Sequence, residues 1–347
     1  MKIIPSILIT LGTCLSACSV PDSPHPQGVP EITLDLDQTV QEKLFYSSFV
    51  DSIAYIPLET TEESLLGEIR DILITDSLIF VLPEERTSIY LFDHAGNFLR
   101  KIKKAGMGPG EYSVINQFSY NKKRKSLAIA SHKIIEYDLF GNLKNEFTTP
   151  YHVSDLHLFD NGDFLLSRLD RIDKPDDIII HTDNNGNIKR SLLKRNPHYR
   201  VNDTHYWEFI TFDDQIRFIS PQVENTLYTF GRDSLVPLLS FHILPEVPKD
   251  FWDKEPFLFE DHYCRTVYRE NKNWIHLVFY SQSKFVRRIL YQKKTHKYWI
   301  AKHVLNDMDD SILEKFFSSA ENNTFVNSVK PPCDEDNPVL QILYLKE

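Results

Sequence analysis

The stretch Ile89-Tyr-Leu-Phe-Asp93-His-Ala-Gly96-Asn97-Phe-Leu99 decides the fold, because similar segments recur along the chain. A second copy covers residues 135–143 and a third covers residues 180–188, each with an Asp-x-x-Gly-Asn core. The core glycines lie at positions 96, 141 and 186, so the spacing is 45 residues both times. Degenerate copies follow at residues 227–235 and 289–298. A fixed spacing of this length indicates a repeat architecture.

Each copy predicts a tight hairpin between two strands of a small antiparallel sheet. Glycine and asparagine tolerate the positive φ angles that such hairpins need, and aspartate can bond its own turn backbone. The first copy belongs to a complete four-strand unit, with strands predicted over residues 69–74, 78–82, 88–93 and 98–102. Similar quartets fit residues 114–147 and 153–193.

Four-strand units at a period of 40–50 residues predict the blades of a β-propeller. The roughly 295 residues from Ile53 to the C-terminus hold about six such units. Strands such as 72–74 and 178–180 are apolar on both faces, which suits sheets packed between two neighbours. We therefore predict an all-β, six-bladed β-propeller with four-stranded antiparallel blades.

A propeller must close its ring, and pairing of N- and C-terminal strands in a shared last blade would do so. The last predicted strand, Val339–Lys346, has its natural partner in Ile53–Leu58. Two segments break the regular pattern. Residues 245–262 are interpreted as an insertion between blades, and residues 309–319 have a helical rhythm of apolar residues, namely Ile312, Leu313, Phe316 and Phe317.

The N-terminus has the features of an export signal. Lys2 is followed by an apolar stretch to Ala17 that is shorter than the roughly 20 residues of a membrane span. The segment Leu15-Ser-Ala-Cys18 resembles a bacterial lipobox, whose cysteine is lipidated. We predict a signal peptide over residues 1–17, a lipidated Pro-rich tether over 18–34 and the propeller over 35–347; an ordinary signal peptide with a chance cysteine is the alternative.

The composition limits the kinds of partner and cofactor that the protein is expected to bind. The net charge of −10 argues against nucleic acid, whose backbone attracts a basic face. The one basic cluster, residues 122–125, lies where a hairpin turn is expected. Cys264 and Cys333 could form a disulfide or remain two free thiols. The sequence has no Cys/His spacing typical of a metal site, so no cofactor or metal is predicted.

Three segments together resemble a known family: Asp51–Thr61, Gly106–Tyr112 and Asp336–Leu340. They are similar to the six-bladed β-propeller lipoproteins of Bacteroidetes, which are related in shape to NHL-type propellers. The resemblance implies the fold, export and an origin in an anaerobic bacterium of the gut or the environment, but no settled activity. Asp22, soon after Cys18, resembles the surface-export signal of such lipoproteins. We expect anchoring in the outer membrane, with a periplasmic or a cell-surface position left open.

The glycine-rich segment 106–112 has two interpretations. As a structural element it would be a tight crossover between blades, with Glu111 and Tyr112 holding it and its glycines allowing unusual backbone angles. As a functional element it would line a ligand site. Phosphate binding is disfavoured because a strand, not a helix, is expected to follow. The residues concerned are Gly106, Gly108, Gly110, Glu111 and Tyr112.

Candidate ligand-lining residues come from two places. His152, Asp155 and His157 begin the third predicted blade, whose inner strand borders the central channel, although most such residues have no catalytic role. Exposed aromatic rings in connections can stack on sugars, although core packing is the alternative. The aromatic candidates are Tyr206, Trp207 and Trp252.

These observations predict a membrane-anchored, monomeric module that binds a glycan, a peptide or an envelope-protein partner. The sequence lacks the Ser/His/Asp order and the Gly-x-Ser-x-Gly segment that would indicate a hydrolase. The alternative is a polysaccharide lyase or hydrolase with its site at the mouth of the central channel, since propellers support both kinds of function.

Overall fold

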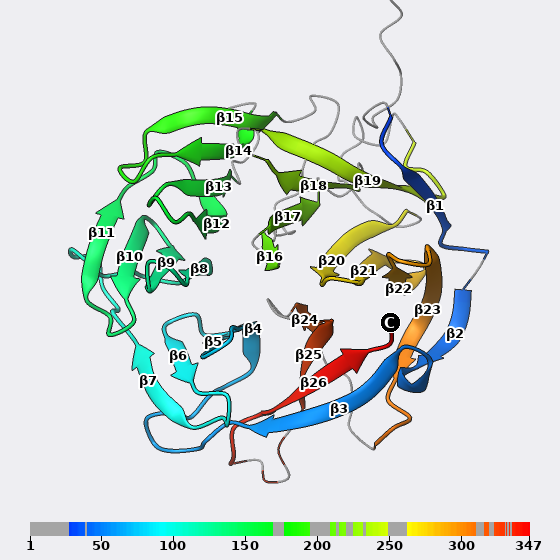
Figure 1. Ribbon diagram of the computed structural model, residues 1–347, viewed down its shortest axis with the longest axis horizontal. Helices are drawn as coiled ribbons and strands as arrows, with labels where there is room; N and C mark the ends of the chain where they lie inside the picture. Colours follow the sequence, from blue (N-terminus) through cyan, green and yellow to red (C-terminus); the bar gives the residue numbers. More distant parts are fainter. Residues whose placement is uncertain are drawn as a thin grey trace, which may run out of the picture.

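The computed structural model shows six sheets arranged around a central axis (Figure 1). It describes residues 28–38, 40–168, 177–194, 209–212, 215–219, 225–231, 234–248, 262–309, 316–318, 323–329, 331, 333 and 335–347. The predicted six-bladed β-propeller is confirmed. In the described part of the chain, no helix is long and apolar enough to cross a membrane.

Blades 1–3 follow one another along the chain, and each consists of four consecutive antiparallel strands. The predicted quartets match them closely. Blade 1 contains β4 (Ile69–Ile74), β5 (Ile79–Pro83), β6 (Ile89–Phe92) and β7 (Phe98–Ile102). Blade 2 contains β8 (Gln117–Asn121), β9 (Ser126–Ala130), β10 (Ile134–Asp138) and β11 (Leu143–Phe147). Blade 3 contains β12 (Val153–Leu158), β13 (Phe164–Arg168), β14 (Asp177–Thr182) and β15 (Ile188–Lys194).

Blades 4–6 complete the ring, and each includes a strand from the N-terminus. Blade 4 contains β16 (Ile210–Phe212), β17 (Gln215–Ile219), β18 (Thr226–Phe230) and β19 (Leu235–Leu244). Blade 5 contains β20 (Cys264–Glu270), β21 (Trp274–Ser281), β22 (Phe285–Gln292) and β23 (Lys297–Leu305). Blade 6 contains β24 (Phe316–Ser318), β25 (Thr324–Val329) and β26 (Val339–Leu345).

Residues 31–57 form what we call the N-terminal strap. Its first strand, β1 (Glu31–Asp35), runs parallel to β19, and its second, β2 (Val40–Phe45), runs parallel to β23. A short 3-10 turn, η1 (Tyr46–Ser48), leads to β3 (Val50–Pro57), which pairs antiparallel with β26. In Figure 1 these blue strands lie along the outer edges of blades 4, 5 and 6.

The strap confirms the predicted ring closure and extends it. Val339 pairs with Pro57 and Leu343 with Ile53, as expected for a shared last blade. The pairing of β1 and β2 was not predicted. The first strand begins at Glu31, four residues before the predicted start of the propeller at residue 35. The outer edges of blades 4 and 5 are therefore covered by a segment assigned partly to the tether.

The core lies between neighbouring blades. All residues of β5, β9 and β13 are buried, in agreement with the prediction of strands apolar on both faces. Leu34 and Leu36 belong to the cluster between blades 4 and 5. Burial of such side chains is worth about 1.5–3 kcal/mol each, so the strap is part of the core and not a surface attachment.

The Asp-x-x-Gly-Asn turns of blades 1–3 share one geometry. In blade 2, Asp138 Oδ1 accepts hydrogen bonds from the N–H groups of Phe140 at 2.8 Å and Asn142 at 2.9 Å. Its Oδ2 accepts from the Asn142 side chain at 2.8 Å, and Gly141 has a φ of +81°. Asp93 and Asp183 make the corresponding bonds in blades 1 and 3.

The predicted helical segment over residues 309–319 is wrong at Phe316–Ser318, the part of it that forms a described strand. Phe316 and Phe317 lie in β24, the inner strand of blade 6, and not in a helix, because pairing with β25 overrides the local apolar rhythm. The rest of residues 310–315 lies outside the described residues. Residues 122–125 form the expected turn between β8 and β9. Cys264 is buried and Cys333 exposed, and both are free thiols.

Candidate functional site

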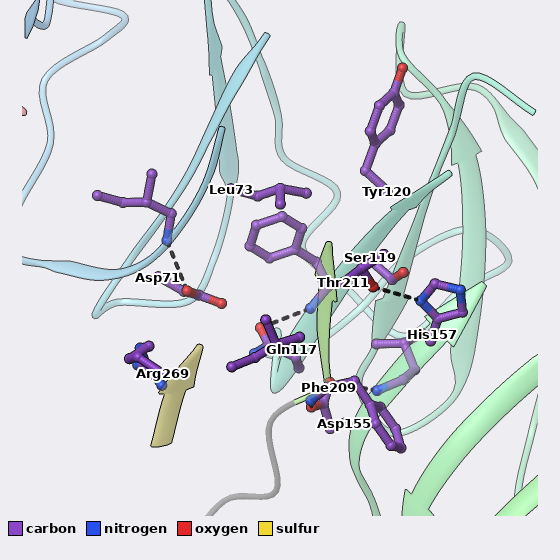
Figure 2. A pocket seen from close by; sticks show the side chains of 14 residues that line it. Asp71, Leu73, Gln117, Ser119, Tyr120, Asp155, His157, Phe209, Thr211 and Arg269 are labelled. Atoms are coloured by element: carbon purple, nitrogen blue, oxygen red, sulfur yellow. Dashed lines mark hydrogen bonds between the residues drawn. The ribbon is translucent and has the colours of Figure 1, made fainter. Parts of the chain in front are cut away.

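A cavity of about 100 Å³ opens on the central channel, and we call it the channel cavity. Its walls come from the inner strands of blades 1 to 5, namely β4, β8, β12, β16 and β20. Figure 2 shows side chains from these separate strands around one space. The polar groups that matter for its chemistry are Asp71, Gln117, Ser119, Asp155, His157 and Arg269.

The two carboxyl groups are positioned by the same backbone device. A register shift in β4 precedes Asp71, and a register shift in β12 precedes Asp155. Each carboxylate then accepts a hydrogen bond from the next N–H group, that of Ile72 at 2.9 Å and that of Leu156 at 2.7 Å. Local irregularities of this kind commonly re-aim a side chain near a functional site.

Gln117 repeats the arrangement in blade 2. Its Oε1 accepts from the N–H group of Phe118 at 3.0 Å, as the carboxylates of blades 1 and 3 do from their own neighbours. Gln117 also hydrogen-bonds the Asp71 side chain. Three consecutive blades thus contribute an acid, an amide and an acid to one cavity (Figure 2).

Burial dominates the electrostatics of both acids. It raises the pKa of Asp71, and it raises that of Asp155 well above the ordinary value. The positive charge of Arg269 opposes this effect at both residues, and at Asp155 the N–H group of Phe209 opposes it too, donating to Oδ2 at 2.5 Å. A carboxyl group in such a site holds a proton more tightly than one in water.

Arg269 is the buried cation of the cavity. Its Nε donates to the carbonyl of Phe316 at 3.0 Å, and its Nη1 donates to the carbonyl of Tyr268 at 2.8 Å. Burial lowers its pKa, while the charges of Asp71 and Asp155 act in the opposite direction. The guanidinium is therefore fixed by backbone carbonyls and interacts with both acids through space.

His157 stands beside the acids as a neutral imidazole. Burial lowers its pKa to about 4. Its Nδ1 lies 3.3 Å from the Thr211 hydroxyl, and its ring packs edge-on against Phe159 with centroids 5.0 Å apart. At neutral pH the ring can accept or donate one hydrogen bond without carrying charge.

The structure brings together only part of the predicted site. Asp155 and His157 both line the channel cavity, whereas His152 is exposed at the start of blade 3 and is not part of the lining. The three aromatic candidates, Tyr206, Trp207 and Trp252, lie outside the described residues.

Sequence reasoning missed Asp71, Gln117 and Arg269. Asp71 could have been identified as a candidate, because it is an acid inside the mostly apolar strand predicted over residues 69–74. No sequence feature marks Gln117 or Arg269, because only the closed ring brings blades 2 and 5 to the same space as blade 1.

The glycine-rich segment lies between β7 and β8, and none of its residues lines the channel cavity. Glu111 accepts from the N–H group of Gly108 at 2.8 Å, and a Cβ on Gly106 would lie 2.1 Å from the Glu111 carboxylate. The Tyr112 hydroxyl donates to the carbonyl of Ile102 at 3.0 Å, and the Tyr137 hydroxyl donates to that of Gly110 at 2.7 Å. These contacts tie the segment to blades 1 and 2.

Among the residues that the structure describes, no group of three or more His, Cys, Asp or Glu side chains could hold a metal ion. The channel cavity instead combines two acids, one guanidinium and one neutral imidazole with apolar walls. Such a set can bind polar groups and move protons.

Solved structures with the same fold include two proteins of Bacteroides. A Bacteroides fragilis protein classed as exported shares 16% identity, with a TM-score of 0.74, over 92% of this chain and 100% of its own. A Bacteroides vulgatus member of the DUF4221 family shares 10% identity, with a TM-score of 0.55, over 86% of this chain and 97% of its own. At these identities the likeness concerns the fold.

Comparison with curated proteins gives no match. Residues 31–343 match the family described as a domain of unknown function, DUF4934, and the chain belongs to this family.

Proposed function

We propose that this protein is an extracytoplasmic, lipid-anchored propeller that binds a small polar ligand in the channel cavity. The observation that carries the proposal is the meeting of Asp71, Asp155, His157 and Arg269 at one cavity on the axis. They come from three separate blades, and a protein gains no stability from burying charged groups that it could have kept in water. Buried ionisable groups with shifted pKa values in a concave site are typical of functional sites.

The walls of the cavity also suit a ligand. Ligand sites are mostly apolar, with a few polar groups that fix orientation. Ile72, Phe118, Leu156, Phe209 and Ile210 supply the apolar surface here. The volume of about 100 Å³ suits a head group or a small molecule, so a larger ligand would insert one of its ends.

Anchoring is proposed from the sequence. Cys18 would carry the lipid, and the first strand begins at Glu31, 13 residues later. A chain of that length spans at most roughly 45 Å when extended. The propeller would therefore work close to a membrane, where an envelope protein or a glycan can reach it.

A binding screen with a blocked cavity tests the proposal. The mature protein is screened by calorimetry against glycans, short peptides and small metabolites, and each hit is repeated with Thr211→Trp, which would fill the cavity, and with Ser52→Trp on the exposed side of β3 as the matched control. We expect ligands that bind the wild type and Ser52→Trp but not Thr211→Trp. Hits that bind all three proteins equally, or no hits at all, would reject the proposed site.

A second candidate function is a polysaccharide lyase or hydrolase at the same cavity. The observation in its favour is the pairing of acids whose pKa is raised with His157, whose pKa is lowered, because groups with opposed shifts can act as acid and base. Measuring reducing-end release on every glycan hit separates the two functions. Turnover that is lost in Asp155→Asn, with binding retained, would establish the enzyme; binding without turnover would leave the binding module.

A further inference from the structure

We propose that the channel cavity binds the primary ammonium group of a small organic cation, held between the carboxylates of Asp71 and Asp155. This inference rests on the proposed ligand-binding function of the cavity and names the chemical class of its ligand. It follows from the balance of charge in the lining, from the free hydrogen-bonding capacity of the carboxylates and from the nature of the walls.

Among the residues that the structure describes, the lining contains one more acid than it has permanent cations. Asp71 and Asp155 face one guanidinium, that of Arg269. One ionised carboxylate balances Arg269, which leaves the second carboxyl group without a counter-charge among the described residues of the lining. Within the described residues neither acid forms an ion pair, and the Nε and Nη1 groups of Arg269 donate to backbone carbonyls. A ligand cation would supply the missing charge, whereas a ligand anion would meet an excess of acids.

Both carboxylates can accept more hydrogen bonds than they receive from the protein. Asp71 accepts from the N–H group of Ile72 and interacts with Gln117. Asp155 accepts from the N–H groups of Leu156 and Phe209. A carboxylate offers about four acceptor positions, so each has room for a donor of the ligand. An ammonium group has three donors and can bridge two such oxygens.

The walls favour an organic cation over a metal ion. Calcium takes six to eight oxygen ligands and magnesium keeps a shell of waters, whereas the apolar walls here offer little of either. Phe118 and Phe209 line the same cavity, and aromatic faces attract ammonium groups. The volume of about 100 Å³ would hold several waters in the free protein, which a group of a few heavy atoms could replace.

Binding would be coupled to release of a proton. Burial raises the pKa of both acids, which favours the protonated form of the carboxyl group that Arg269 does not balance. When the cation binds, that proton leaves to the buffer and the carboxylate pairs with the ammonium group. Affinity should then rise by roughly tenfold per pH unit until the acid is fully ionised. The other charged or titratable groups that face the acids are Arg70 on β4, Tyr120 on β8, His157 on β12 and Arg269 on β20, while β16 contributes none to the lining.

Three small probes of matched size test the inference with the mature protein. Ethanolamine carries the ammonium group, ethylene glycol is its neutral counterpart and glycolate is the anion. Calorimetry in two buffers of different ionisation enthalpy measures both affinity and the number of protons released. We expect ethanolamine to bind at least tenfold more tightly than either other probe at pH 8, to release protons on binding at lower pH, and to bind more weakly as the pH falls.

Substitution of the acids completes the test. Asp71→Asn and Asp155→Asn should each weaken ethanolamine binding at least tenfold and abolish the proton release. Asp51→Asn, at an exposed position of β3, removes the same charge away from the channel and should change neither. Circular dichroism verifies that each variant is folded, and if Asp155→Asn is not, Asp71→Asn decides.

Each contrary result has a separate meaning. Equal or tighter binding of ethylene glycol or glycolate that Thr211→Trp abolishes would overturn the ammonium inference and leave the binding function standing. Calcium or magnesium chloride that displaces ethanolamine at a lower concentration would overturn the choice of an organic cation. If none of these probes binds, the inference is wrong, and the blocked-cavity screen alone then decides whether the cavity binds any ligand.

Discussion

Blades 1–3 have four strands each, whereas blades 4 and 5 gain a fifth, outer strand from the N-terminal strap and blade 6 takes its fourth strand from it. Each of the first three is built from four consecutive strands, and its outer hairpin is closed by an aspartate turn. Each of the last three takes a strand from the N-terminal strap, from β1, β2 or β3 in turn. Local sequence therefore determines one half of the ring, while pairing over more than 200 residues completes the other half.

The difference matters for the site because the channel cavity spans both halves. Its acids, Asp71 and Asp155, come from blades 1 and 3, whereas Arg269 comes from blade 5. Thr211, in blade 4, lies between them along the ring. Loosening of the strap would thus move the cation relative to the acids even though no strap residue touches the cavity.

Removal of residues 339–347 should have the largest effect on this comparison. It deletes β26, the partner of β3, and with it the buried side chains of Leu340, Ile342, Leu343 and Leu345. Their burial is worth about 6–12 kcal/mol, which is comparable with the whole stability of a typical domain. We expect loss of cooperative unfolding in calorimetry. A truncated protein with an unchanged melting curve would show that the ring does not depend on this closure.

Leu34→Ala tests the strap in blade 4 and should have the next largest effect. Leu34 is fully buried in the cluster between blades 4 and 5, so the substitution should cost about 2–5 kcal/mol in the free energy of unfolding. Urea denaturation measures this cost, and hydrogen exchange should show earlier loss of protection in β19 than in β5. Leu99→Ala, at a half-exposed position of blade 1, is the control and should cost less than about 1 kcal/mol. Equal costs would mean that the strap contributes no special stability.

The turn glycines offer a test within the regular half. Gly96 and Gly141 occupy the same place in the turns of blades 1 and 2, with φ of +86° and +81°. A Cβ on Gly96 would lie 2.0 Å from the backbone oxygen of Pro57 in the strap, whereas one on Gly141 would have its nearest neighbour at 3.6 Å. Both changes to alanine incur the left-handed backbone cost, and Gly96→Ala should cost about 1–3 kcal/mol more. Similar urea midpoints for the two variants would contradict this contact with the strap.

His157→Gln should have the smallest effect, and its effect on stability should be seen as the pH falls below neutral. In the folded protein the pKa of His157 is lowered to about 4, from an ordinary value of 6.5. The unfolded chain therefore binds a proton that the folded chain does not, and stability is lost as the pH falls from 6.5 toward 4. The variant should lose less melting temperature between pH 7.5 and pH 5 than the wild type does. The acids Asp71 and Asp155 remain in both proteins, so the comparison isolates the histidine.

His152→Gln is the matched control for that experiment, because His152 begins the same blade but is exposed. It should follow the wild-type pH dependence. A similar flattening in both variants would show that burial of His157 is not the cause.

Much of the fold was predictable because its signals are local. The spacing of Gly96, Gly141 and Gly186 gave the blade period, and the aspartates before them gave the hairpins. The same local reasoning failed for Phe316, whose apolar neighbours suit a helix as well as a strand until β25 is placed beside it. It also failed for β1, since a short segment with alternating side chains carries no sign of a partner about 200 residues away.

The site was predictable only where its polar residues are dense along the chain. Asp155 and His157 attracted attention because they lie within three residues on one inner strand. Asp71 and Arg269 lie on separate strands far apart along the chain, and their meeting depends on the curvature and closure of the whole ring. Sequence patterns alone do not predict which residues of different blades meet in this way.

The strap also sets the order in which the chain can fold during synthesis. Asp35, at the end of β1, precedes the start of β19 at Leu235 by 200 residues. At about 5–20 residues per second, a ribosome needs roughly 10–40 s to make that intervening stretch. Blades 1–3 contain all their own strands and are complete by Lys194, whereas the strap must wait for partners that are made last. A chain that is still being made can thus hold half a ring, but the channel cavity lacks Arg269 until β20 of blade 5 emerges.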